Sequence, residues 1–122
     1  MAQFLILVTT PHCDSSSAKT TYEFCRSAVS SGHEILGIFF YGTGVTHANK
    51  FNVAIPEEPS SKALWDDLAT TLKVDLLVCA TAASRRGIMD DSEAKLNHLP
   101  TGSINSNFKM SGLTELAALS DR

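Results

Sequence analysis

The sequence predicts an α/β protein built on a mainly parallel sheet. Short, continuous apolar runs recur along the chain, and such runs are typical of strands buried on both faces of a parallel sheet. Stretches with apolar residues at helical spacing lie between these runs, so strands and helices alternate. The chain has 122 residues, which is the usual length of one domain. We therefore expect residues 1–122 to form a single domain.

The first strand is expected at Phe4–Val8, where the sequence FLILV is apolar throughout. The polar segment Thr9–Ser17 contains a proline and predicts a loop. A helix is expected from about Ser16, because apolar or small residues then recur at helical spacing, and the serines at 15–17 offer an N-cap. Gly32 is expected to end this helix.

The middle of the chain predicts two further strands with a helix between them. The second strand is expected at Glu34–Tyr41, which is rich in Ile and Phe. Two glycines and two prolines in Gly42–Pro59 predict a loop with at most short helical turns. An amphipathic helix is expected over Ser60–Leu72, with Trp65 at the border of its apolar face. The third strand is expected at Val74–Cys79.

The last third of the chain has weaker signals. Acidic residues favour a helix start, so a helix is expected to begin near residues 90–91. A short strand is expected around Ile104 or Phe108. The final helix is expected at Gly112–Leu119, with Ser111 as its cap.

The composition excludes several classes of function. A net charge of −3 provides no basic field for a nucleic-acid backbone, so direct binding of tRNA or DNA is not expected. No apolar stretch approaches the roughly 20 residues of a membrane span, and the N-terminus lacks the basic region of a signal peptide. We therefore expect a cytoplasmic protein. Three cysteines without metal-ligand spacing predict neither a zinc site nor a disulfide framework.

The stretch LLVCATAASRRG, residues 76–87, carries the strongest candidate chemistry. Cys79 ends a predicted strand, and ligands of parallel sheets bind beyond the carboxyl ends of the strands. Cys79 is either a packed structural cysteine or a reactive thiol. We favour the reactive thiol, because the small residues that follow predict an open loop that leaves room beside the sulfur. Arg85 and Arg86 would favour the nucleophilic thiolate or bind an anionic partner surface; the alternative for them is a solvated turn.

Other candidate groups carry weaker signals. Cys13 follows His12 in the first loop, but neighbouring side chains need not face each other. Cys25 lies on the apolar face of the first helix and is expected in the core. His47 is a weaker candidate for lining the site. We find neither a phosphate-binding loop nor a Ser-His-Asp arrangement.

Three stretches of the chain resemble the DsrE/TusD family of sulfur-relay proteins. They are GHEILGIFFYGTGVTHAN (32–49), VCATAASRRGIMDDSEA (78–94) and SGLTELAALSDR (111–122). With the strand-loop-helix opening, the resemblance covers nearly the whole chain. It implies a flavodoxin-like three-layer α/β/α sandwich. It also implies that Cys79 accepts sulfur, because the family's persulfide-forming cysteine falls in the motif VCATAASRRG. Chains of the family continue after Asp-Arg with a short apolar strand, and this sequence ends at Arg122.

The resemblance further implies a function. The chain would be a sulfurtransferase that carries a persulfide and needs no metal or organic cofactor. It would join two homologous subunits in a heterohexamer, take sulfur from a TusA-like donor and pass it to a TusE/DsrC-like cysteine. This relay would serve 2-thiolation of the wobble uridine in tRNA. The alternatives are a DsrE subunit of a sulfur-oxidation pathway, or a non-catalytic DsrE-like module that binds a partner or small molecule. A thiol reductase is not expected, because no Cys-x-x-Cys is present.

Overall fold

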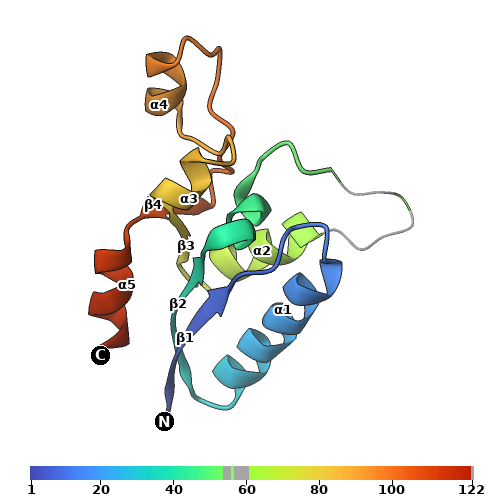
Figure 1. Ribbon diagram of the computed structural model, residues 1–122. Helices are drawn as coiled ribbons and strands as arrows, with labels where there is room; N and C mark the ends of the chain where they lie inside the picture. Colours follow the sequence, from blue (N-terminus) through green and yellow to red (C-terminus); the bar gives the residue numbers. More distant parts are fainter. Residues whose placement is uncertain (54–55, 57–60, 122) are drawn as a thin grey trace.

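A parallel sheet forms the centre of the computed structural model, which describes residues 1–53, 56 and 61–121 (Figure 1). Within these residues the sheet has four strands in the order β1-β2-β3-β4. Every neighbouring pair is parallel, which confirms the predicted fold class. The strands are β1 (Gln3–Val8), β2 (Glu34–Phe40), β3 (Leu76–Cys79) and β4 (Phe108–Ser111).

The helices form two unequal layers on the sheet. Each strand pairs with the next one along the chain, so the sheet grows in one direction. Right-handed connections then place α1 and α2 on the same face of the sheet, and these two helices pack together. Figure 1 shows α5 on the other side of the sheet, where the side chain of Leu119 approaches Gly37. The helical elements are α1 (Ser15–Ser30), the 3₁₀ helix η1 (Gly42–Ala48), α2 (Ser61–Thr70), α3 (Ala80–Ser84), α4 (Asp91–Leu96) and α5 (Leu113–Ser120).

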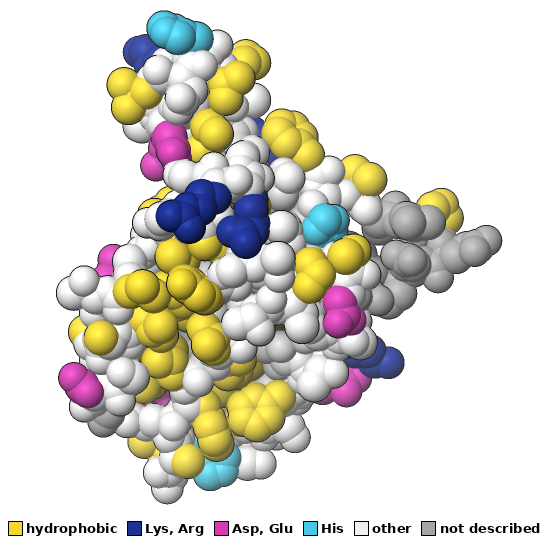
Figure 2. Space-filling model, viewed as in Figure 1, with side chains coloured by type: hydrophobic (Ala, Val, Ile, Leu, Met, Phe, Trp, Pro, Cys, Tyr) yellow, Lys and Arg dark blue, Asp and Glu magenta, His cyan; other side chains and the backbone are white. Residues whose placement is uncertain are grey.

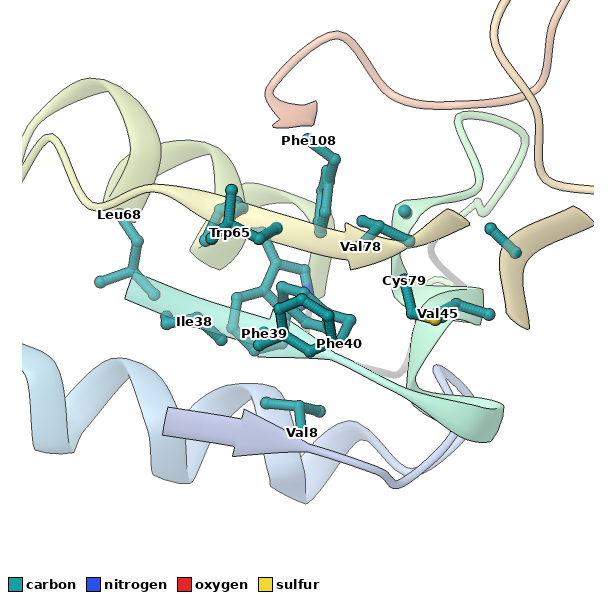
Figure 3. Packing of buried hydrophobic residues seen from close by; sticks show 14 of the residues in the cluster. Val8, Ile38, Phe39, Phe40, Val45, Trp65, Leu68, Val78, Cys79 and Phe108 are labelled. Atoms are coloured by element: carbon teal, nitrogen blue, oxygen red, sulfur yellow. The ribbon is translucent and has the colours of Figure 1, made fainter. Parts of the chain in front are cut away.

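The core lies between the sheet and the layer of α1 and α2, and aromatic side chains fill its centre (Figure 3). Phe40 packs edge-to-face on Trp65, with ring centroids 5.0 Å apart. The expected position of Trp65 at a helix border is wrong, because Trp65 is only 1% exposed. Its indole N–H donates a hydrogen bond to Nδ1 of His47, and this bond allows the polar end of the ring to be buried.

Most helix boundaries follow the sequence signals. Gly32 has φ +85° and follows the end of α1, a conformation that glycine adopts without strain. The N-cap position of α1 is Asp14 rather than a serine. Asp90 caps α4, because its carboxylate accepts a hydrogen bond from the backbone N–H of Glu93. The end of the expected loop before α2 and the expected helix start at Ser60 lie outside the described residues.

The C-terminal segment corrects one prediction. The expected short strand exists as β4 and contains Phe108, whereas Ile104 forms only an isolated bridge with Asn49. Ser111 is not the cap of α5: it is the last residue of β4, and Gly112 occupies the N-cap position. Ser111 therefore belongs to the strand and lies at the carboxyl edge of the sheet.

Candidate functional site

The parallel strands end at one edge of the sheet, and a cavity of about 440 Å³ opens there. We call it the Cys79 cavity. Segments that follow β2, β3 and β4 form its wall, so it lies where parallel sheets bind ligands. Cys79, Arg85, Arg86 and Ser111 are in this wall, together with Tyr41. The structure thus brings together the three residues that the sequence nominated and adds further polar side chains, among them Ser111 and Thr81.

Cys79 occupies the junction between a strand and a helix. It is the last residue of β3 and the N-cap residue of α3, so the chain turns directly from sheet to helix. The expected open loop after Cys79 is therefore wrong: Ala80–Ser84 is helical, in keeping with the high helix propensity of alanine. Cys79 is 4% exposed and belongs to the same buried cluster as Val45 (Figure 3). Access to the sulfur is consequently through the Cys79 cavity.

The two arginines lie at the far end of α3 and reach back to the cavity. Both are exposed, and Figure 2 shows dark blue side chains gathered over this part of the molecule. Nη1 of Arg86 donates to the carbonyl of Ala82. Within the described residues, neither guanidinium has a carboxylate within ion-pair distance. The wall of the Cys79 cavity therefore carries two positive charges that are free to meet an anion or an acidic partner.

Ser111 is the residue that sequence reasoning missed. It pairs with Cys79 in the register of β3 and β4, and it is 4% exposed. Among the described residues, its hydroxyl is a buried side-chain polar group without a hydrogen-bond partner. A buried polar group without a partner is uncommon and costly. The sequence indicated the position of Ser111 only through the short strand expected near Phe108. The end of that strand determines which residue lies beside Cys79.

Hydrogen bonds join the first loop, which follows β1, to η1, whose first residue is in the cavity wall. The backbone N–H of His12 donates to Oγ1 of Thr46, and Oγ1 of Thr43 donates to the carbonyl of Thr9. Cys13, in the same loop, is exposed and is absent from the wall of the Cys79 cavity. The loop therefore supports the site from outside, and Cys13 stays the weak candidate that the sequence made it.

His47 is a buried structural group rather than part of the cavity wall. Because the indole of Trp65 can only donate, Nδ1 of His47 accepts and the proton lies on Nε2. Nε2 then donates to the carbonyl of Thr10. Burial lowers the pKa of His47 to about 4; the Thr10 carbonyl and Asp14 oppose this shift, and His12 adds to it. The neutral ring thus ties α2 and the first loop to η1.

This buried histidine predicts an acid-sensitive fold. An unfolded histidine takes up a proton near pH 6.5, whereas folded His47 does so only near pH 4. The unfolded state therefore binds more protons in this window, and the free energy of unfolding should fall by about 3 kcal/mol as the pH drops through it. Urea unfolding at several pH values measures this loss.

The matched variant is His47→Gln, whose amide can accept from Trp65 and donate to Thr10 without titrating. Its free energy of unfolding should change less over the same pH range. His98→Asn removes an exposed histidine and should keep the wild-type loss. An equally steep acid loss in His47→Gln would show that other groups cause the acid sensitivity.

Cys25 is separated from the Cys79 cavity by its position in the core. Cys25 is fully buried, as expected, and burial raises its pKa to about 11, so its thiol is protonated and inert at neutral pH. Within residues 1–53, 56 and 61–121, no three His, Cys, Asp or Glu side chains gather to hold a metal ion. In the same ranges, no helix has the length and apolar character needed to cross a membrane.

Comparison with known proteins gives concordant matches in sequence and in structure. Residues 2–122 match the sequence profile of the DsrE/DsrF-like family. The sulfurtransferases TusD of Yersinia pestis (strain Pestoides F) and Yersinia pseudotuberculosis (serotype O:3, strain YPIII) are each 36% identical over 115 residues, covering 94% of this chain and 88% of theirs. The crystal structure of the ychN protein from E. coli superimposes with a TM-score of 0.70 over 98% of this chain and 92% of that one. At 18% identity this last likeness concerns the fold alone, and it supports the expected α/β sandwich.

Proposed function

The chain belongs to the DsrE/DsrF-like family, and from this membership we propose that it is a sulfurtransferase that carries sulfur as a persulfide on Cys79. One observation carries the assignment to this residue. Cys79 ends a central strand inside a cavity whose wall also holds two arginines without carboxylate partners. Cys25 is enclosed in the core, and Cys13 lies outside the cavity. Cys79 alone combines access with positive charge.

The carrier reaction consists of two sulfur transfers. The thiolate of Cys79 attacks the outer sulfur of a donor persulfide, R–S–SH. A bond forms between Sγ and that sulfur, the donor's S–S bond breaks, and the donor leaves as the thiolate R–S⁻. Cys79 now carries –S–SH. An acceptor thiolate then attacks the same outer sulfur, and Cys79 leaves as a thiolate. Neither step needs a metal, an oxidant or an organic cofactor.

The partners of the relay are proteins. A chain of net charge −3 holds no tRNA directly, so sulfur passes from a TusA-like donor and on to a TusE/DsrC-like acceptor cysteine. Two homologous subunits complete a heterohexamer. The sheet face on the side of α5 supports this assembly, because Leu7 and Leu113 are each 54% exposed. Figure 2 shows apolar side chains gathered over α5 and the adjoining strands, as expected of a surface that another subunit covers.

The proposed destination is 2-thiolation of the tRNA wobble uridine in the cytoplasm. The curated relatives at 36% identity are named TusD sulfurtransferases, which favours this branch over sulfur oxidation. The free cysteines of the chain agree with a reducing compartment. A non-catalytic binding module is disfavoured, because it would not need a thiol at the cavity.

The test follows one sulfur atom through the protein. The purified protein, incubated with a persulfidated TusA-like donor, should gain the mass of one sulfur atom on the peptide that contains Cys79. Addition of a TusE/DsrC-like acceptor should move that mass to the acceptor. In the double variant Arg85→Ala/Arg86→Ala we expect transfer to slow about tenfold, because two charges that steer or hold an anionic partner are lost.

The matched control is the double variant Lys19→Ala/Lys95→Ala, which changes net charge equally but removes charges outside the Cys79 cavity. It should transfer at the wild-type rate. Equal slowing in both double variants would show that net charge, and not the arginine pair, governs docking. A wild-type protein that never gains sulfur would refute the carrier function.

A further inference from the structure

The hydroxyl of Ser111 is unsatisfied in the unloaded protein, and its position beside Cys79 suggests what would satisfy it. Residues paired across parallel strands lie about 4.8 Å apart and project to the same face of the sheet. Ser111 and Cys79 are such a pair, and both are in the wall of the Cys79 cavity. Even so, the hydroxyl forms no hydrogen bond with the thiol.

An added sulfur atom would change this relation. A persulfide places a second sulfur about 2.05 Å beyond the first, and Cys79 is in the wall of a cavity with room for that atom. A persulfide is more acidic than a thiol, so its outer sulfur carries negative charge once the proton has gone to solvent. A hydrogen bond from a buried hydroxyl to a charged acceptor is stronger than one to a neutral acceptor.

We propose that Ser111 is the persulfide-binding residue of the site, and that its hydroxyl donates a hydrogen bond to the outer sulfur of persulfidated Cys79. This inference rests on the proposed carrier function. The partner of the hydroxyl exists only in the loaded state, which explains why a polar group that is 4% exposed lacks one here. The backbone supports the same role. No side chain caps the N-terminus of α5, because Gly112 occupies the N-cap position. The backbone N–H groups at this helix end therefore add partial positive charge at the cavity.

The protein would therefore hold the Cys79 persulfide inside the cavity as a stabilised anion. Arg85 and Arg86 are exposed and suit a partner, whereas Ser111 is buried and suits the sulfur. An acceptor thiolate attacks the protonated form, –S–SH, so the outer sulfur takes a proton back from solvent before it is transferred. By stabilising the anion, the Ser111 hydroxyl slows adventitious transfer to other thiols.

The test is a pH titration of the loaded protein. Wild type, Ser111→Ala and Ser111→Thr are loaded with a low-molecular-weight persulfide, and near-ultraviolet absorbance of the persulfide anion is followed against pH. In Ser111→Ala the titration midpoint should rise by about one pH unit, because one hydrogen bond to the anion is lost. Ser111→Thr keeps the hydroxyl and should titrate as wild type does. Ser84→Ala removes a hydroxyl outside the cavity wall and should also match wild type.

The outcomes separate this inference from the proposed function. Wild-type protein that takes up no sulfur refutes the carrier function itself. Loading at Cys79 with the same midpoint in wild type and Ser111→Ala refutes only the role of Ser111. Thermal melting of the unloaded proteins gives a third readout. Ser111→Ala should melt no lower than wild type, since it loses an unsatisfied group, and a lower melting temperature would show that the hydroxyl has a structural partner and overturn the inference.

Discussion

Serine in place of Cys79 should give a protein that folds normally and takes up no sulfur. The substitution changes one atom of a buried side chain, so the packing of the core around it is kept. A serine hydroxyl is far too weakly acidic to attack a persulfide at neutral pH, whereas the thiolate is the attacking species in this exchange. Mass spectrometry after incubation with a persulfide donor should show full loading of wild type and none of Cys79→Ser.

The other cysteines provide the matched controls. Cys13→Ser removes an exposed thiol outside the Cys79 cavity, and Cys25→Ala removes a core thiol whose pKa burial raises to about 11. Both variants should load the mass of one sulfur atom at Cys79. Loss of loading in Cys13→Ser would place the first loop in the mechanism. Loading that persists in Cys79→Ser would assign the carrier role to another residue.

The position of Cys79 could be predicted because the signals for it are local. A buried strand of a parallel sheet is apolar over consecutive residues, so LLVC marks both the strand and its end. The end of such a strand lies at the ligand-binding edge. The open loop expected after Cys79 was wrong. That expectation considered only the small size of the residues in ATAAS, whereas its three alanines also have a high helix propensity.

Ser111 and Trp65 could not be placed from the sequence, because distant segments determine their surroundings. The spacing of apolar residues identifies one face of α2, but the acceptor that lets the Trp65 indole be buried is His47 of η1. Ser111 lies beside Cys79 only because β4 pairs with β3 in a particular register. A four-residue strand carries too little pattern to determine register from sequence.

Alanine at Gly44 should destabilise the fold and the site together. A Cβ at this position would overlap the carbonyl oxygen of Val8 and lie 2.8 Å from its carbonyl carbon. That oxygen accepts the backbone N–H of Tyr41 at 3.0 Å, so the end of β1 is fixed and cannot yield easily. We expect a loss of about 3 kcal/mol in the free energy of unfolding. Thermal melting should show it as a drop of roughly 10 °C.

The control for this variant is Gly37→Ala in β2. Its added Cβ would lie 3.6 Å from the Asp75 carbonyl oxygen, an ordinary contact, so its melting temperature should stay within about 4 °C of wild type. Because η1 begins at Gly42, which is in the cavity wall together with Tyr41, Gly44→Ala should also lower sulfur loading at Cys79 under conditions where it remains folded. A Gly44→Ala protein that melts and loads as wild type does would show that η1 can move away from β1 at little cost. The Cys79 cavity would then owe its shape to α3 and β4 rather than to the packing of η1 on the end of β1.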